Sequence, residues 1–293
     1  YFVGVWVRTW RWHYLLRPIK AIPTTSLFPI VTIGYAANNI FPARAGEVLR
    51  AIVLKRHEGV AISASLATII VERVYDGVVM LGFIFVNLNE LAKLTGTSGF
   101  VGDIRTLAIV GTLAFLGALG VFLAAAMFPE RAMAIVRLLT QYLAPKKYRE
   151  KLIAILEKFL EGLAALRSPR EALMVFLTSV VIWLIETFKY WILMHAFPFE
   201  VSFFTLMLMN GISNLVTTIP SAPGYLGTFD ASGIAVLTAF NVEYNLAAVY
   251  TLVLHAALWF PITMLGAYYY FRQPLRWGKD IQKIEQNQES LPA

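Results

Sequence analysis

The stretch Asn38-Asn39-Ile40-Phe41-Pro42-Ala43-Arg44-Ala45-Gly46-Glu47-Val48-Leu49-Arg50 places charged and helix-breaking residues at the end of a long apolar run. Hydropathy alone would predict a membrane crossing at this point. Irregular backbone and charge occur at membrane depth only where they are buried in protein or line a water-filled cavity. We therefore interpret this stretch as the edge of a site.

The composition predicts an integral membrane protein. Of the 293 residues, 58% are hydrophobic and only 15% are charged, a balance unlike that of soluble globular domains. The net charge of +7 is concentrated in a few loops, which indicates contact with anionic lipid headgroups rather than nucleic acid. The absence of cysteine excludes disulfides, thiolate nucleophiles and cysteine-based zinc sites. Because the sequence begins inside an apolar aromatic segment, we expect a further crossing upstream.

The apolar run Ile22 to Phe41 has a basic segment on each side. The helix predicted over Tyr1 to Leu16 has a basic exit formed by Arg8, Arg11, Arg17 and Lys20. The segment after the run is also basic, with Arg44, Arg50, Lys55 and Arg56. Positive charge favours the cytoplasmic side, so both ends of the run are predicted to be cytoplasmic. The run is therefore expected to form a re-entrant hairpin or a broken helix pair, with breaks at Pro23, Pro29 and Gly34.

A second broken element is predicted near the other end of the chain. There the apolar run Val201 to Ile219 is interrupted over residues 220–228 and resumes at Phe229. Both breaks contain an isoleucine, a proline and a later glycine, from Ile40 to Gly46 and from Ile219 to Gly224. The loop charges give the two elements opposite orientations, which predicts two inverted-topology repeats, each with a broken or re-entrant helix, as in transporters. Chance similarity of proline and glycine positions is the competing interpretation.

We expect an all-α polytopic membrane protein with four parts. Residues 1–128 and 170–272 are predicted to be the N-terminal and C-terminal membrane repeats. A cytoplasmic linker, 129–169, joins them, and a disordered cytoplasmic tail follows at 273–293. Apolar residues at helical spacing between Leu152 and Leu166 predict an amphipathic linker helix in the membrane interface, with an ordinary solvated helix as the alternative.

Charged residues of two segments form the main candidate site. They are Arg44, Glu47 and Arg50 in the opening stretch and Glu72, Arg73 and Asp76 in the helix predicted over Val60 to Leu88. The planar guanidinium group suits phosphate, so we assign the arginines to a lipid headgroup phosphate. The acids would balance this charge or contact a cationic headgroup. The alternative is a buried ion-pair network that locks the hairpin to the helix. No metal-ligand spacing or nucleophile motif occurs, so no catalytic residue, metal or cofactor is expected.

Uncharged residues are predicted to shape the cavity around the two breaks. The residues that interrupt the helices are Pro42, Gly46, Pro220, Pro223, Gly224 and Gly227. The breaks leave backbone groups without helical hydrogen bonds. We expect the side chains of Asn38, Asn39 and Asn214 to bond these groups, with Asn210 a weaker candidate. Asp230 either caps the second half-helix or faces the cavity. Glu186 and Lys189 are interpreted as a structural pair, and His195 and His255 as isolated residues.

Three motifs together resemble a known family. NNIFPARAGEVLRAIVLKR (residues 38–56), VERVYDGVVML (71–81) and TTIPSAPGYLGTFD (217–230) are similar to the membrane region of the lysylphosphatidylglycerol synthase family, whose members are described as flippase-like. The resemblance covers essentially the whole chain. It implies a multi-pass protein of the inner cell membrane that moves a charged or glycosylated lipid between leaflets. No segment corresponds to the soluble aminoacyl-transferase domain of bifunctional members, so synthase activity is not carried over.

The sequence leaves three functions open. The preferred one is a non-enzymatic, flippase-like transporter of a phospholipid or a lipid-linked headgroup. Its expected partners are anionic phospholipid or lipid-linked sugar, together with a second copy or a separately encoded synthase, and its C-terminus is predicted to be cytoplasmic. The second is an integral membrane enzyme of lipid or polyprenyl-phosphate metabolism, with Glu47, Glu72 or Asp76 as acid or base. The third is a non-catalytic partner of a glycosyltransferase or synthase. Transport requires that residues 38–50, 72–76 and 219–230 line one cavity.

Overall fold

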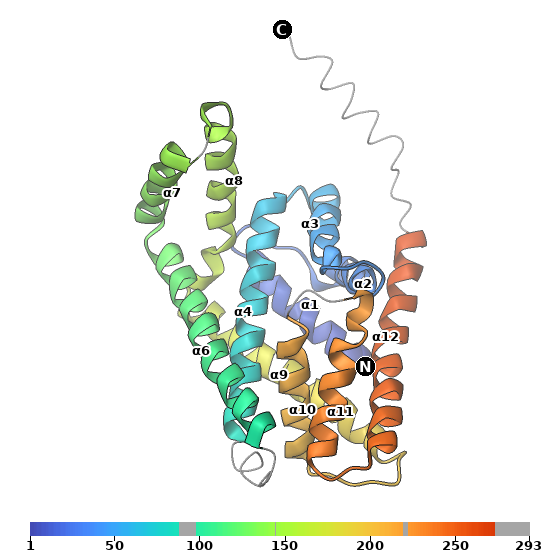
Figure 1. Ribbon diagram of the computed structural model, residues 1–293. Coiled ribbons are helices and arrows are strands. Elements are labelled where there is room, and N and C mark those ends of the chain that lie inside the picture. The colour runs from blue at the N-terminus through green and yellow to red at the C-terminus, as the bar shows by residue number, and fades with distance from the viewer. Residues whose placement is uncertain (88–97, 144, 219–221, 273–293) are drawn as a thin grey trace.

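The computed structural model describes residues 1–87, 98–143, 145–218 and 222–272, and omits the side chains of 98–108 and 143. The described residues form helices, with no β-strand among them, which confirms the all-α prediction (Figure 1). The α-helices are α1 Phe2–Leu16, α2 Thr24–Ile40, α3 Ala45–Glu58, α4 Ile62–Val86, α6 Ser98–Met127, α7 Pro129–Leu143, α8 Arg149–Gly162, α9 Pro169–Met194, α10 Phe203–Val216, α11 Thr228–Ala239 and α12 Tyr244–Arg272. Short 3-10 helices lie at η1 Lys146–Tyr148, η2 Ala164–Arg167 and η3 Pro223–Tyr225.

Several helices have the length and composition of membrane spans. Within the described residues these are Ile109–Met127 of α6, all of α9 and all of α12. The long helix α4 runs beside them and ends within two residues of the bounds predicted from the sequence. Its acidic and basic side chains face the protein interior, as buried membrane charges do. The chain is therefore a multi-pass membrane protein.

The first broken element is a hairpin made of two complete helices. Helix α2 continues through Pro29 and Gly34, so the predicted breaks at these residues are wrong. Pro29 lies near the start of the helix, where it removes only one early backbone hydrogen bond. Gly34 serves packing instead: a Cβ on Gly46 of α3 would lie 2.0 Å from the Gly34 carbonyl oxygen. The chain reverses at residues 41–44, where Arg44 adopts a left-handed φ of 55°.

The second broken element is also a hairpin, formed by α10, η3 and α11. Its turn contains three residues with a positive φ: 65° at Gly224, 63° at Tyr225 and 83° at Gly227. Two of these are glycines, as this region of backbone space favours. Pro223 opens η3, whereas Pro220 lies outside the described residues.

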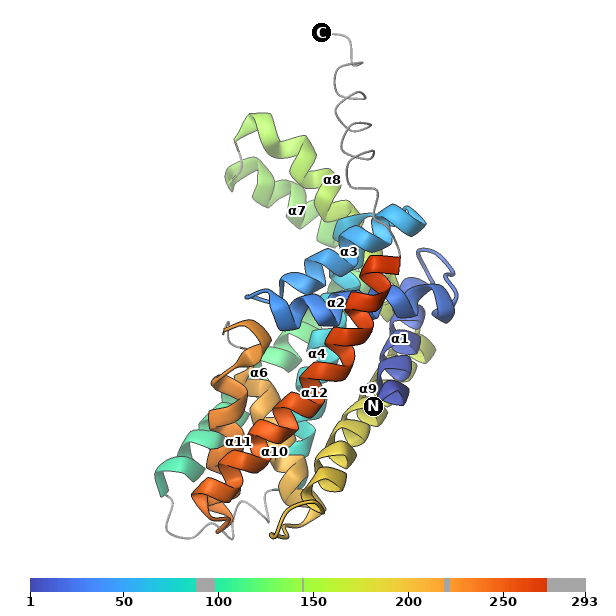
Figure 2. The same cartoon turned by 90° about the vertical axis from the view of Figure 1, so that its right-hand side faces the viewer.

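The turns of the two hairpins touch (Figure 2). Arg44 donates from Nη2 to the carbonyl oxygen of Thr217 at 3.1 Å, and its guanidinium lies 5.5 Å from the centre of the Tyr225 ring. The register that aligns Pro42 with Pro220 also aligns α2 with α10 and α3 with α11. The inverted relationship of the two halves stays a prediction.

Helices α7 and α8 project beyond the bundle at the end where α12 finishes (Figure 1). Gly162 at the base of α8 packs against the backbone of Ala64 in α4, where a Cβ would lie 2.4 Å from the carbonyl oxygen. Apolar side chains remain exposed on both projecting helices: Ile135, Leu138, Leu139, Tyr142, Leu152 and Ile155. It stays a prediction that residues 129–169 are cytoplasmic and lie in the membrane interface. The boundaries of the four parts also stay predictions. The tail predicted to be disordered lies outside the described residues.

Candidate functional site

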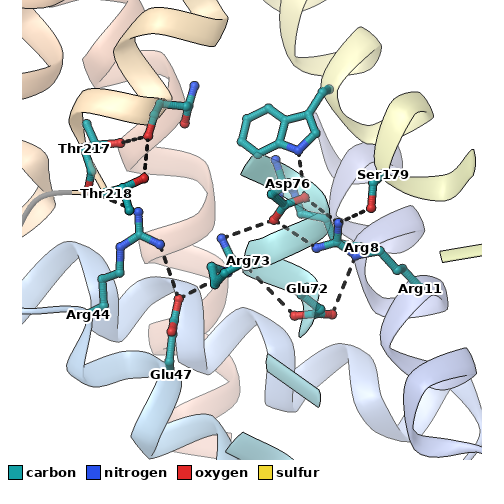
Figure 3. A network of polar contacts seen from close by, with 12 residues as sticks. Arg8, Arg11, Arg44, Glu47, Glu72, Arg73, Asp76, Ser179, Thr217 and Thr218 are labelled. Atoms are coloured by element: carbon teal, nitrogen blue, oxygen red, sulfur yellow. Dashed lines mark hydrogen bonds and ion pairs between the residues drawn. The ribbon is translucent and has the colours of Figure 1, made fainter. Parts of the chain in front are cut away.

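A buried arginine joins three helices at the centre of the molecule. Arg11 of α1 is fully buried and donates to the carboxylate of Asp76 on α4 and, at 2.8 Å, to the hydroxyl of Ser179 on α9. Asp76 also accepts a hydrogen bond from the indole of Trp183 at 2.8 Å. Figure 3 shows these partners converging from separate helices. Burial of such a charge is tolerable only with this degree of pairing, so the contact fixes α1, α4 and α9 relative to one another.

A second buried pair attaches the first hairpin to α4. Arg50 of α3 donates from two nitrogens to the two carboxylate oxygens of Glu72, at 2.8 and 3.2 Å. The guanidinium also stacks over the Trp12 ring, 3.5 Å from its centre. Both members are at most 4% exposed. The charges of Arg50 and Glu72 are therefore paired with each other, as the ion-pair alternative expected.

Arg44, Glu47 and Arg73 form a looser chain toward the hairpin turns. Glu47 Oε1 lies 3.6 Å from Arg44 Nη1 and 3.4 Å from Arg73 Nε, and Arg73 Nη1 lies 3.4 Å from Asp76 Oδ2 (Figure 3). Both arginine side chains are 25% exposed. One carboxylate thus serves two guanidinium groups through long contacts, which leaves donors available for an anion.

A cavity of about 180 Å³ lies where the two hairpin turns meet α1, α4, α9 and α12. All three segments expected to line one cavity contribute: Asn38, Asn39 and Arg44 from the first, Arg73 from the second, and Gly224 and Tyr225 from the third. Glu47 and Asp76 instead line a neighbouring cavity of about 250 Å³ that shares Arg44 and Arg73. Arg50, Glu72 and Asp230 are not on the wall of the central cavity. Headgroup binding by the predicted residues stays a prediction.

The cavity wall contains two further cations, Arg8 and Lys189, for which the sequence predicted other roles. Arg8 donates to Glu186 at 2.9 Å, and Lys189 lies 2.7 Å from the other oxygen of the same carboxylate. Arg8 and Arg11 were expected to form a basic cytoplasmic exit, but both point into the bundle, and only Arg17 and Lys20 are exposed. The available signal was an arginine inside an apolar helix, which favours a buried role.

Aromatic rings and amides complete the wall. Lys189 lies 4.2 Å from the centre of the Tyr1 ring, and Arg8 lies 4.9 Å from that of Trp183. Asn39 donates to Thr263 at 2.8 Å, which ties the end of α2 to α12. The side-chain oxygen of Asn38 is buried without a hydrogen-bond partner. The cavity therefore offers cationic, aromatic and amide surfaces together.

The amides of α10 form a hydrogen-bonded chain, and Asn214 also lines the central cavity. Asn214 donates to the side-chain oxygen of Asn210 at 2.7 Å, and Asn210 donates to Thr187 on α9 at 3.0 Å. Asn210, the weaker candidate, is fully buried and joins the two helices.

The second hairpin turn is held by a histidine and an aspartate. Asp230 accepts a hydrogen bond from the backbone nitrogen of Gly227 at 2.9 Å, so it caps α11. Its other oxygen lies 2.7 Å from Nδ1 of His255, whose Nε2 lies 2.8 Å from the carbonyl oxygen of Gly224. The interpretation of His255 as isolated is wrong, because spacing along the sequence does not reveal a partner on another helix. His195 contacts the backbone of its own helix.

The acidic groups at the centre of the molecule lie in ion pairs. Among the side chains that the structure describes, no group of three or more histidine, aspartate or glutamate residues is arranged to hold a metal ion. The buried carboxylates of Glu72, Asp76 and Glu186 each contact arginine or lysine.

Comparison with known proteins gives a family match along most of the chain. The model of the lysylphosphatidylglycerol synthase TM region matches residues 1–266. The glycosyltransferase AglD of Haloferax volcanii is 29% identical, over 80% of this chain and 41% of its own length, so this chain spans about two fifths of that relative. A UPF0104 membrane protein of Methanothermobacter thermautotrophicus is 23% identical over 89% of this chain and 77% of its own. UPF0104 membrane protein MJ1595 of Methanocaldococcus jannaschii is 24% identical over 87% of this chain and 77% of its own length. No solved structure matches the chain significantly.

Proposed function

Because the chain belongs to the lysylphosphatidylglycerol synthase TM region family, we propose that it moves a lipid with an anionic headgroup between the two leaflets of the cell membrane. The observation that carries this proposal is the charge of the central cavity. Its described wall contains the cations Arg8, Arg44, Arg73 and Lys189 but only one carboxylate, that of Glu186. A cavity with surplus positive charge at the centre of a membrane protein favours a phosphate-bearing headgroup over a neutral or cationic one.

Arg44 and Arg73 are the headgroup-binding residues in this proposal. Their contacts to Glu47 are 3.4 to 3.6 Å long and their side chains are partly exposed. By contrast, Arg8 and Lys189 make short contacts with Glu186. A phosphate between the two hairpin turns would accept hydrogen bonds from Arg44 and Arg73 without breaking the buried network. Arg50 and Arg11 are paired with buried carboxylates and hold the helices that position Arg44 and Arg73.

Neutral groups of the wall suit the remainder of the headgroup. Asn38 and Asn39 contribute amide groups to this wall, and Tyr225 and Trp259 contribute aromatic rings. These groups match the hydroxyls of a glycerol- or sugar-containing headgroup, so phospholipid and lipid-linked sugar are both substrates under this proposal. The acyl or polyprenyl chains would remain in the surrounding bilayer.

The arrangement of the hairpins supplies a route for the movement. In transporters built from inverted repeats, the substrate site lies between broken helices near the middle of the bilayer, and access alternates between the two sides. Here the cavity lies where the turns of α2–α3 and α10–α11 meet. We place α7, α8 and the end of α12 on the cytoplasmic side, because basic residues of the chain concentrate there.

Reconstitution tests the proposal directly. Purified protein in vesicles is assayed for translocation of a headgroup-labelled anionic phospholipid, by loss of label to a membrane-impermeant quencher. Arg44→Gln and Arg73→Gln should each slow translocation about tenfold or more, because a hydrogen bond to a charged group contributes about 1.5–3 kcal/mol. The matched control is Arg170→Gln, which changes an exposed arginine at the start of α9. Unchanged translocation in both cavity variants would reject the site.

A second candidate function follows from the glycosyltransferase-named relative. In this reading the chain is the membrane part of a lipid-glycosylating system and presents a lipid-linked sugar phosphate to a transferase. Copurification of a transferase with the chain, and a glycosylated lipid formed from labelled sugar donor only when both are present, would favour it. Under the transport proposal the chain alone suffices.

A further inference from the structure

His255 and Asp230 form a pair at the second hairpin turn. The hydrogen bonds of this pair determine how many protons the two side chains share. His255 on α12 places Nε2 2.8 Å from the Gly224 carbonyl oxygen, which only accepts hydrogen bonds. It places Nδ1 2.7 Å from Oδ1 of Asp230. A neutral imidazole has one N–H donor, so Nε2 uses that proton and a second proton must lie between Nδ1 and Oδ1.

The second proton belongs on the ring. The other oxygen of Asp230 accepts the backbone N–H of Gly227 at 2.9 Å, at the N-terminus of α11. The peptide dipoles of a helix favour a negative charge at this end. The pair is therefore an imidazolium facing a carboxylate, at the edge of the central cavity that His255 lines.

We propose that the His255–Asp230 pair is a proton-binding site whose occupancy holds the turn Pro223–Gly227 against α12, and that release and uptake of this proton couple transport to a pH gradient. The coupling rests on the proposed transport function, whereas the proton-binding site does not. The pair holds the turn at two points, the carbonyl of Gly224 and the N–H of Gly227.

Loss of the proton would destabilise the turn. Without it, the lone pairs of Nδ1 and Oδ1 face each other at 2.7 Å. The turn also contains Tyr225 at a φ of 63°, a conformation that non-glycine residues adopt at a cost. When the pair separates, one anchor of the turn is lost and this conformation is no longer enforced. Because Arg44 lies over the Tyr225 ring, movement of the turn changes the cationic wall of the cavity.

Other ionisable groups of the same cavity set the field around the pair. The acidic or phenolic groups are Glu186 and Tyr190 on α9, Tyr35 on α2, Tyr225 on the turn and Tyr1 before α1, and the cations are Arg8, Arg44, Arg73 and Lys189. The carboxylate of Asp230 is in direct contact with His255.

Nitrogen NMR of the histidine side chains tests the proton count. The full chain is labelled with ¹⁵N-histidine in lipid nanodiscs, and His255 is assigned by comparison with His255→Gln; the control His195→Gln removes an exposed ring instead. At pH 7 both ring nitrogens of His255 should carry protons, and the ring should become neutral at higher pH. In Asp230→Asn the amide can donate to Nδ1, so the ring should be neutral at pH 7. A neutral His255 in the wild-type chain at pH 7 overturns the proposal, and the wild-type spectrum decides this even if a variant does not fold.

Translocation under a pH gradient tests the coupling separately. In the vesicle assay an imposed gradient should accelerate lipid movement by the wild-type chain and by His195→Gln, and this response should be lost in His255→Gln. Translocation by the wild-type chain that ignores the gradient overturns the coupling but leaves the transport function standing. Absence of any translocation, with a doubly protonated His255 in the spectrum, overturns the transport function and the coupling and retains the proton-binding site.

Discussion

The two hairpins reach the same cavity but are held in place by different chemistry. The α2–α3 hairpin is attached to α4 through ion pairs, of which the buried pair Arg50–Glu72 is the shortest. The α10–α11 hairpin is attached to α9 through a hydrogen bond from an amide to a hydroxyl group, and to α12 through one histidine–aspartate pair. Neutral hydrogen bonds between membrane helices contribute little individually. We infer that the first hairpin provides a fixed cationic wall and that the second is the hairpin that moves.

The largest expected effect is on the buried ion-pair network. Asp76→Asn keeps the shape of the side chain but leaves Arg11 without its main buried counter-charge. Removal of one member of a buried pair costs about 3–5 kcal/mol, so the thermal unfolding temperature of the purified protein should fall steeply. Tryptophan fluorescence during heating measures it.

A surface pair provides the control for this experiment. Glu161→Gln removes an exposed carboxylate whose contact with Lys158 on α8 lies in solvent. An exposed pair contributes about 0–1 kcal/mol, so the unfolding temperature should hardly change. Equal behaviour of Asp76→Asn and Glu161→Gln would contradict the structural role of the network.

An intermediate effect on stability is expected when a glycine of either hairpin is replaced by alanine, and its size should differ between the two hairpins because their packing differs. Gly46→Ala in the first hairpin places a Cβ 2.0 Å from the backbone oxygen of Gly34, which cannot move without shifting α2. Gly233→Ala in the second places a Cβ 2.6 Å from the terminal methyl of Met209, which can rotate away, and 2.9 Å from the methyl group of Thr251. Overpacking costs about 1–3 kcal/mol, and Gly46→Ala should lie at or above the top of this range.

Gly46→Ala and Gly233→Ala are compared with a variant in which the added methyl group meets no neighbour. Gly82→Ala on α4 serves as that reference, because nothing lies within 4 Å of the added Cβ. Unfolding of all three proteins is followed in one detergent. If Gly233→Ala were the more damaging change, the second hairpin would be the more rigid of the two.

The smallest effect is expected at the amides of the second hairpin. Asn210→Ala removes the bond to Thr187 and the acceptor of Asn214. An interhelical hydrogen bond in a membrane protein contributes roughly 0.6 kcal/mol and at most about 1.7. The fall in unfolding temperature should therefore be well below that of Asp76→Asn. A loss as large as that of Asp76→Asn would show that these amides hold the helices as strongly as the buried ion-pair network does.

The sequence predicted the helices better than it predicted their partners. The charges inside an apolar segment marked α4, and proline with glycine marked both turns, because these are local properties of the chain. Gly34 was mistaken for a break, since only the contact with Gly46 on another helix shows that it serves packing.

The candidate site was predicted in part, for the same physical reason. Arg44 and Arg73 lie on the cavity wall, and both are charged residues in apolar surroundings that local sequence reveals. Arg8 and His255 were missed because their partners are 178 and 25 residues away in sequence. Local charge patterns place a basic residue near a helix end, whereas the tertiary contacts decide whether it faces the cytoplasm or the cavity.

Photo-crosslinking tests most directly whether an anionic lipid headgroup enters the cavity between the two hairpin turns. Protein in nanodiscs is exposed to an anionic phospholipid with a photoreactive group in the headgroup, and labelled peptides are identified by mass spectrometry. We expect labelling of the turn containing Tyr225 and of the segment containing Asn39, and less labelling in the double variant Arg44→Gln/Arg73→Gln. Labelling confined to outward-facing positions such as Leu113, which is 72% exposed, and unchanged in the double variant would contradict this expectation.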